Sequence, residues 1–178
     1  MVGMVGMNVD ADVDVVRVAS GPHLGAPLVV DKRGEPVTPA VYVSITHHEG
    51  LAVAAAHDAP VGIDLTRVEA LDAAFNREAF CDGELASFCA YGAACVAVAF
   101  AAKEACAKLL GVGFALPLLG FSVRPDGARR GLLDVVHGAE GCPPGARRVH
   151  LRVHRFGGRE INRGDRVLVV AASYTERP

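Results

Sequence analysis

The chain lacks any pair of cysteines at the C-x-x-C spacing that many metal-binding and redox motifs use. Its five cysteines, an odd number, are Cys81, Cys89, Cys95, Cys106 and Cys142. Four of them lie in Ala-rich, helix-like sequence, where a reduced cysteine serves as a small apolar side chain. This pattern argues against a zinc site and predicts a protein of the reducing cytoplasm.

The chain also lacks a strong net charge and a long apolar run. A formal net charge of -2 gives no overall attraction to nucleic acid or to a membrane surface. The longest apolar run, from Ala93 to Ala102, is too short to span a bilayer. Residues 1–8 lack the features of a signal peptide, so we expect them to form a loose tail. Neither nucleic acid nor membrane is expected as a partner.

The remaining composition is that of a folded domain. Apolar residues make up 51% of the 178 positions and charged residues 21%, which excludes a disordered chain. The length suits one domain with a substantial core, and no long linker interrupts the sequence. We therefore expect a single domain over residues 1–178.

Short apolar runs bounded by turn residues predict strands in the first part of the chain. In 9–18 valines alternate with aspartates, which predicts a half-buried strand with one acidic face in water. A short strand is predicted at 27–30. The runs 41–45 and 51–56 predict a hairpin with the loop 46–50, and 61–65 predicts a further buried strand.

The middle of the chain is helical in pattern and the end returns to strands. Between about 71 and 110, Gly83 and Gly92 divide the sequence into about three helices, and Asp82 is a candidate N-cap. Four more strands are predicted after this helical region: 121–123, 132–136, 149–153 and 167–172. Strands, then helices, then strands indicate an α+β architecture.

Two acidic residues lie in unusually apolar surroundings. Asp64 lies near the end of the buried strand, and Glu104 lies in a helix whose other charges are Lys103 and Lys108. Two buried carboxylates that meet repel each other, which raises the pKa of each unless a cation lies between them. A hard divalent cation held by both, with Lys108 one turn beyond Glu104, suits pyrophosphate chemistry.

Each of these residues also has a purely structural explanation. Glu104 and Lys108 form an i,i+4 pair worth about 0.2–0.5 kcal/mol on any helix surface. Asp64 could be a turn acid and His47 an ordinary loop histidine. Zinc binding by His47, His48 and Glu49 is disfavoured, because adjacent residues on a strand point to opposite faces.

The order of several short segments resembles that of the 4'-phosphopantetheinyl transferases, which transfer phosphopantetheine from coenzyme A to a serine of a carrier protein. The segments are Ser44-Ile45-Thr46-His47, Gly62-Ile63-Asp64, Glu84, and Lys103-Glu104 followed by Lys108. The order, with the histidine segment first, is similar to that of the larger surfactin-synthetase type. The resemblance implies an antiparallel sheet packed with helices.

The resemblance also implies a metal centre. Asp64 and Glu104 match the two carboxylates that hold Mg²⁺, which would bridge the pyrophosphate of coenzyme A. Lys108 matches a lysine that contacts the phosphates and passes a proton to the leaving group.

Four further residues match family positions with supporting roles. Thr46 and His47 match a hydroxyl residue and a histidine that grip phosphate on the nucleotide side. Lys103 could contact phosphate or cap a neighbouring acid. Glu84 matches an acid near the catalytic lysines.

The chain departs from the larger type in two ways. Thr66 stands where the larger type has a third acid, and in lacking that acid the chain resembles the small holo-acyl-carrier-protein synthases. Without it, the general base could be Glu104, Glu84 or a water. The helical part of the first half is missing, together with its basic residues for the coenzyme A phosphates. Lys32 and Arg33 are conceivable substitutes. The shortened half leaves apolar surface uncovered, which makes a homo-oligomer plausible.

The expected activity is Mg²⁺-dependent transfer of 4'-phosphopantetheine from coenzyme A to an acyl or peptidyl carrier protein. The carrier is expected to dock along the segment after Asp64, which offers Arg67, Leu71, Phe75, Arg77 and Phe80. Two alternatives stay open. One is a non-catalytic module that binds coenzyme A or a carrier protein, and the other is a Mg²⁺-dependent pyrophosphate hydrolase.

Overall fold

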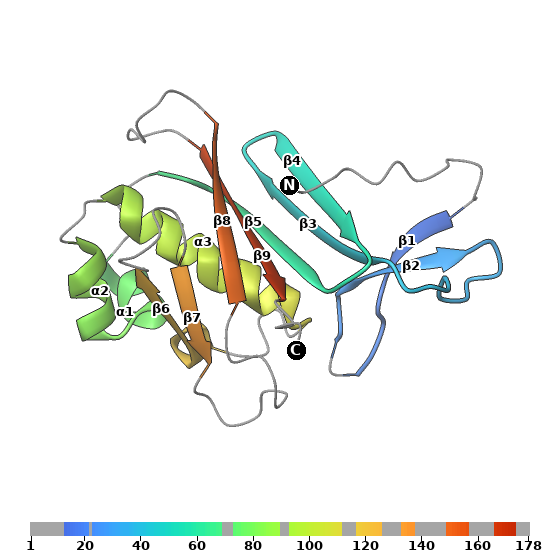
Figure 1. The fold of residues 1–178 in the computed structure, drawn as a ribbon, viewed down its shortest axis with the longest axis horizontal. Coiled ribbons are helices and arrows are strands. Elements are labelled where there is room, and N and C mark those ends of the chain that lie inside the picture. Colours follow the sequence, from blue (N-terminus) through green and yellow to red (C-terminus); the bar gives the residue numbers. More distant parts are fainter. Residues whose placement is uncertain are drawn as a thin grey trace, which may run out of the picture.

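A computed structural model describes most of the chain (Figure 1). The described residues are 13–21, 23–68, 73–89, 93–111, 117–125, 133–137, 149–156 and 166–173. The expected tail 1–8 lies outside them, so a single domain over 1–178 stays a prediction. Among the described helices, none is long and apolar enough to cross a membrane.

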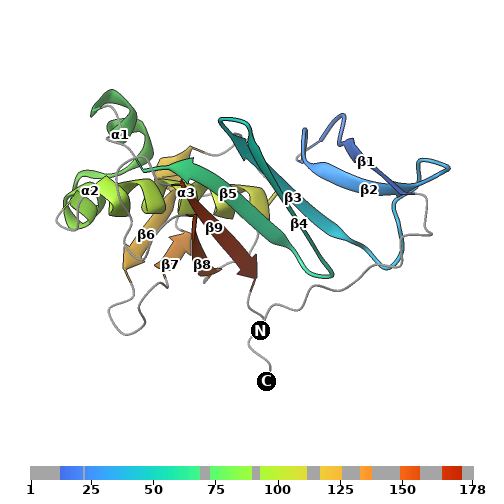
Figure 2. The ribbon, with the colours of Figure 1, turned by 90° about the horizontal axis from the view of Figure 1, so that it is seen from above.

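The centre of the fold is a five-stranded antiparallel sheet. Its strands lie in the order β5 (Val61–Arg67), β9 (Arg166–Ser173), β8 (Val149–Phe156), β7 (Leu133–His137) and β6 (Phe121–Pro125). The last strand of the chain thus lies between the first strand of this sheet and the others. The predicted α+β architecture, an antiparallel sheet packed with helices, is confirmed (Figures 1 and 2).

In the described part of the chain three α-helices follow β5, the number predicted, but Gly83 lies inside the second of them and not between two helices, and Gly92 lies outside the described residues. The helices are α1 (Ala73–Ala79), α2 (Asp82–Cys89) and α3 (Ala93–Leu109), and a 3₁₀ turn at Leu118–Gly120 leads into β6. The long helix α3 packs against the sheet with a face of small side chains, several of which have no exposed surface. Small residues at a helix contact let the backbones come close.

The contact between α3 and β5 is especially close at Gly62. A Cβ added to Gly62 would lie 1.9 Å from the backbone oxygen of Ala105 and 2.5 Å from the backbone nitrogen of Leu109. Only glycine leaves room for this approach. The approach brings Asp64, two residues further along β5, beside the turn of α3 that carries Glu104 and Lys108.

Before β5 comes a hairpin of β3 (Tyr42–His48) and β4 (Leu51–His57). Its turn is only the two residues Glu49 and Gly50, with φ of 44° and 79°. Positive φ at both central residues is typical of the type I′ turn, whose twist fits a hairpin. The predicted five-residue loop 46–50 is therefore too long, and residues 46–48 belong to strand β3.

The first hairpin joins β1 (Val13–Arg17) to β2 (Pro27–Asp31) and extends away from the central sheet (Figure 2). The prediction that the first strand is half-buried is wrong for its described part, because all five residues of β1 are exposed. Alternation of valine and aspartate marks a strand, but burial also needs a packing partner. Strand β1 is paired with β2 in a two-stranded sheet.

Candidate active site

Asp64 is the centre of the site. Its carboxylate Oδ1 accepts hydrogen bonds from Lys108 Nζ at 2.7 Å and from the Thr46 hydroxyl at 3.1 Å. Strand β5 supplies Asp64, helix α3 supplies Lys108 and hairpin strand β3 supplies Thr46. Three elements therefore meet at one carboxylate, whose side chain is only 11% exposed.

The Thr46 hydroxyl also accepts a hydrogen bond from the Leu65 backbone N–H at 3.1 Å, and Ser44 Oγ accepts one from the Ile63 N–H at 3.0 Å. These hydroxyls occupy the place at the edge of β5 where a neighbouring strand would offer carbonyl groups. The hairpin is thus attached to β5 through side chains of β3, and this attachment places Thr46 against Asp64.

Glu104 lies close enough to interact electrostatically with both Asp64 and Lys108. Burial is the largest cause of the raised pKa of Glu104, and the negative charge of Asp64 raises this pKa further, while Lys108 acts against the rise. Burial also raises the pKa of Asp64, although Lys108 and the hydrogen bonds from Thr46 and Leu65 act in the opposite direction. One lysine therefore does not fully compensate the two buried acids.

This electrostatic imbalance fits a hard divalent cation. Carboxylate oxygens are the ligands that Mg²⁺ prefers, and Mg²⁺ usually keeps several waters beside one or two carboxylates. Among the described residues no group of three His, Cys, Asp or Glu side chains is placed to hold a metal. Asp64 and Glu104 would accordingly hold the ion with water and substrate oxygens completing its shell. Thr66, on the same face of β5 as Asp64, adds no charge.

Lys103 and Glu84 form a second charged pair. Lys103 Nζ donates to Glu84 Oε2 and to the carbonyl oxygen of Ala79, both at 2.6 Å, and lies 4.7 Å from the centre of the Phe80 ring. The other Glu84 oxygen accepts the backbone N–H of Val123 at 2.6 Å.

Lys103 is fully buried, and burial is the main cause of its lowered pKa, although Glu84 acts to raise it. These contacts favour the structural alternative for Lys103, a cap on a neighbouring acid. They tie α2, α3 and β6 together, and they hold α3 in the position from which Glu104 and Lys108 reach Asp64.

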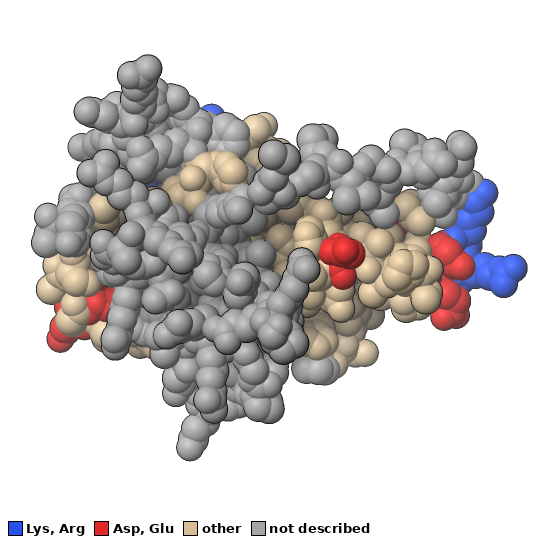
Figure 3. All heavy atoms as spheres, in the orientation of Figure 1, with Lys and Arg blue, Asp and Glu red and all other residues tan. Residues whose placement is uncertain are grey.

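Other predicted residues lie apart from this centre. His47 is exposed, and because neighbours on a strand alternate, its side chain lies on the face of β3 opposite Thr46. Lys32 and Arg33 lie in the turn after β2, at the far end of the first hairpin, where basic and acidic side chains gather (Figure 3). The structure does not bring either group to Asp64.

The predicted docking segment divides into core and surface. Phe80 is buried in the main core and Phe75 is partly buried, with its ring edge-on to Phe100 at 4.9 Å between centroids. Arg77 is exposed, whereas Leu71 lies outside the described residues. Arg67 and Arg77 are therefore the described docking candidates that reach the surface.

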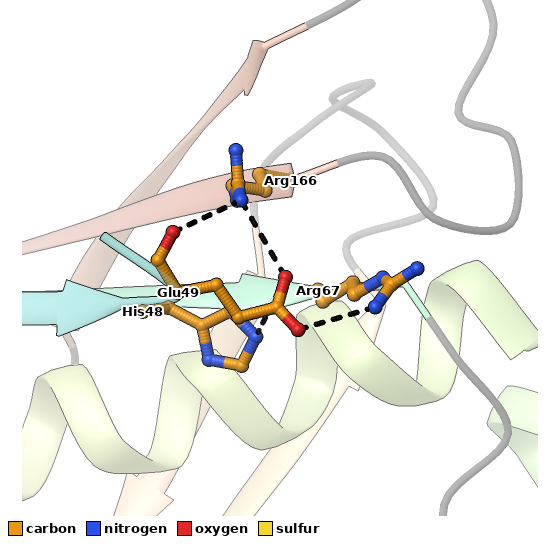
Figure 4. A network of polar contacts seen from close by, with 4 residues as sticks. All are labelled: His48, Glu49, Arg67 and Arg166. Atoms are coloured by element: carbon orange, nitrogen blue, oxygen red, sulfur yellow. Dashed lines mark hydrogen bonds and ion pairs between the residues drawn. The ribbon is translucent and has the colours of Figure 1, made fainter. Parts of the chain in front are cut away.

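Sequence reasoning missed a network at the tip of the β3–β4 hairpin (Figure 4). Glu49 Oε1 accepts from Arg67 Nη1 at 3.2 Å, and Arg166 Nη2 contacts both the Glu49 backbone oxygen, at 3.3 Å, and Oε2, at 3.5 Å. His48 Nε2 lies 4.0 Å from the same oxygen. Arg166 and Glu49 are 117 residues apart, so no local pattern could have paired them.

Comparison with models of known protein families gives one result that bears on this geometry. Residues 60–161 match the 4'-phosphopantetheinyl transferase superfamily, and since this match covers more than half of the chain, the protein belongs to that superfamily. It is thereby assigned to a group of transferases that move phosphopantetheine. A comparison with curated proteins gives no match. The matched region holds Asp64, Glu84, Lys103, Glu104 and Lys108.

Proposed function

We propose that the protein is a Mg²⁺-dependent enzyme that transfers 4'-phosphopantetheine from coenzyme A to a serine of an acyl or peptidyl carrier protein. The observation that carries this proposal is the grouping of Asp64, Glu104 and Lys108 inside a region that matches the superfamily. We expect the reaction to take place in the cytoplasm, where cysteine thiols stay reduced.

In the proposed reaction the carrier serine Oγ attacks the β-phosphorus of coenzyme A. The new P–O bond forms as the bond to adenosine 3',5'-bisphosphate breaks, and the serine proton passes to a base. Bound Mg²⁺ would supply positive charge to the pyrophosphate oxygens. Asp64 and Glu104 are the residues that would hold it.

Lys108 has the exposure that its role requires. Its side chain is 28% exposed, so Nζ can leave Asp64 Oδ1 for a phosphate oxygen of the substrate. At that position it would stabilise charge on the leaving nucleotide and donate a proton to it. The ion pair with Asp64 keeps the ammonium group oriented until substrate arrives.

For the serine proton we assign Glu104 as the acceptor. Burial and Asp64 raise its pKa in the metal-free protein, and a bound Mg²⁺ would act against this rise. Glu104 is chosen because its carboxylate lies beside Asp64 and Lys108, where the pyrophosphate would bind. Glu84 is less suited to this role because both of its oxygens already accept hydrogen bonds within the core. Glu84 and Lys103 are proposed instead to position α3. His47 and Thr46 would contact phosphate only if the hairpin shifts.

Intact-mass spectrometry tests the proposal directly. A panel of apo acyl and peptidyl carrier proteins is incubated with the protein, coenzyme A and Mg²⁺, with EDTA in a parallel sample. The expected result is a gain of one phosphopantetheine on a carrier, lost with EDTA. Coenzyme A binding without transfer to any carrier would favour a binding module. Release of free phosphopantetheine without a carrier would favour a pyrophosphate hydrolase.

A further inference from the structure

The β3–β4 hairpin carries a residue of the candidate active site, and it packs along β5 without joining the backbone ladder of the central sheet. Its two strands form a sheet of their own, and in the described part of the chain no backbone ladder connects them to β5. Leu51, Val53 and Ala55 of β4 pack against the apolar side chains of β5. Among the described residues, the Ser44 and Thr46 hydroxyls and the network at the tip add polar contacts.

The network at the tip places one acid between two cations. Arg67 and Arg166 are directly opposite each other on β5 and β9, so two like charges face each other across the ladder. Such a pair is destabilising unless an anion lies between them. Glu49 is that anion, and its backbone oxygen is bound by Arg166 as well.

The backbone of Glu49 supports a specific role for its side chain. Its φ of 44° lies in the left-handed region, which glycine and asparagine adopt more readily than glutamate. The turn alone would therefore be better served by another residue. What glutamate adds at this position is a carboxylate that reaches the ends of β5 and β9.

The tip lies close to the active site along the chain. Glu49 follows Thr46 by three residues, and the Thr46 hydroxyl holds both Asp64 and the Leu65 N–H. Since side-chain contacts fix β3 along β5, an anchor at the tip determines where that hydroxyl lies.

We propose that Glu49 is a positioning residue. Its ion pairs with Arg67 and Arg166 anchor the hairpin so that the Thr46 hydroxyl holds Asp64 in the geometry of the active site. The effect on catalysis rests on the function proposed above, but the anchoring itself can be measured without it.

Hydrogen exchange of backbone amides, followed by NMR, tests the anchoring. In Glu49→Gln, protection of the Ile63 and Leu65 amides should fall about fivefold or more, while amides in the β8–β9 ladder keep theirs. Asp58→Asn is the matched control. It removes an exposed acid that is paired with His57 at the other end of the same hairpin, and it should leave both amides unchanged.

Arg166→Gln provides a second variant that keeps Glu49 and its turn conformation, and it should lower protection at the same two amides. Unchanged protection in both variants would overturn the proposal. An equal loss at every amide of the sheet would also overturn it, because Glu49 would then contribute only to general stability.

The catalytic effect is tested by kinetics and by metal binding. Glu49→Gln should lower kcat by about fivefold or more with little change in the KM for coenzyme A, and it should weaken Mg²⁺ binding measured by calorimetry. In a Thr46→Val background the same change should have little further effect, since the contact it controls is already absent. Additive effects would contradict the proposed route through Thr46.

If the wild-type protein transfers nothing, the proposed function fails, whereas the exchange and Mg²⁺ titrations still decide whether Glu49 anchors the hairpin. If transfer occurs and Glu49→Gln changes neither kcat nor Mg²⁺ binding, the positioning role fails alone.

Discussion

Replacement of Gly62 by alanine is expected to damage the active site without touching any charged residue. The new Cβ would lie 1.9 Å from the backbone oxygen of Ala105, whereas non-bonded heavy atoms prefer separations of about 3.5 Å. Strand and helix would have to separate by about 1.5 Å to restore this distance. Because the contact is between backbones, no side-chain rotation can absorb the strain.

The separation acts on the residues that share these two elements. Asp64 follows Gly62 on β5, and Lys108, 2.7 Å from its carboxylate, lies on α3 beside the contact. Overpacking of this kind costs about 1–3 kcal/mol of unfolding free energy. A displacement of about 1 Å in a catalytic geometry can cost about a hundredfold in rate. We therefore expect kcat to fall about a hundredfold, which corresponds to about 2.7 kcal/mol in the activation free energy, in a protein that still folds.

Chemical denaturation and the carrier assay measure the two effects. Gly83→Ala is the matched control, since a Cβ added to Gly83 meets nothing within 4 Å. Gly83 lies in α2, and in helices alanine is favoured over glycine by about 1 kcal/mol. Gly83→Ala should be neutral or slightly stabilising, with normal transfer. If Gly62→Ala behaved in the same way, the close contact of α3 with β5 would not be what assembles the site.

Three further changes test the buried acid Glu104, the ion pair of Lys103 with Glu84, and the Thr46 hydroxyl between β3 and β5. Glu104→Gln should abolish transfer yet raise the Tm of the metal-free protein at neutral pH. Folding raises the pKa of Glu104 above its ordinary value of 4.5, so the charged carboxylate opposes folding at pH values above 4.5. Below about pH 4 the carboxyl group is protonated in both states, and the gain in Tm should vanish. Thermal denaturation of the variant and the wild type at several pH values measures this. Lys103→Met leaves Glu84 buried without its cation and should cost about 3–5 kcal/mol in urea denaturation; additivity with Glu84→Gln would contradict the pairing. Thr46→Val leaves a buried N–H of β5 without its acceptor and should cost about 1–3 kcal/mol by the same method, with Thr46→Ser retaining most of the stability.

Much of this fold could be predicted from local patterns. Apolar runs mark the strands and Ala-rich sequence marks the helices, because these signals depend on residues near each other in the chain, but Gly83, expected between helices, lies inside α2. Asp64 and Glu104 could be paired in advance because charged side chains are expensive in apolar surroundings, and each therefore needs a partner.

The sequence could not predict features that depend on distant partners. Strand β1 has the alternation of a half-buried strand, but no described element covers its valines. The hydroxyls of Ser44, in a predicted strand, and of Thr46, in the predicted loop, accept hydrogen bonds from amides of β5, a role that no local pattern suggests. The contact of Glu49 with Arg166 joins a turn to the beginning of the last strand.

The positions of the charges on α3 explain how a largely apolar helix can serve chemistry. Lys103 and Glu104 are neighbours in sequence, and about 100° of helical rotation separates their directions. Lys103 is held within the core by Glu84, which restricts rotation of the helix about its axis. Glu104 and Lys108, one turn apart, therefore keep a fixed direction toward Asp64.

With two carboxylates and one ammonium group the site has a surplus negative charge, which a divalent cation would reverse. We expect the site to attract a pyrophosphate only in that state, so coenzyme A should bind more tightly in Mg²⁺ than in EDTA.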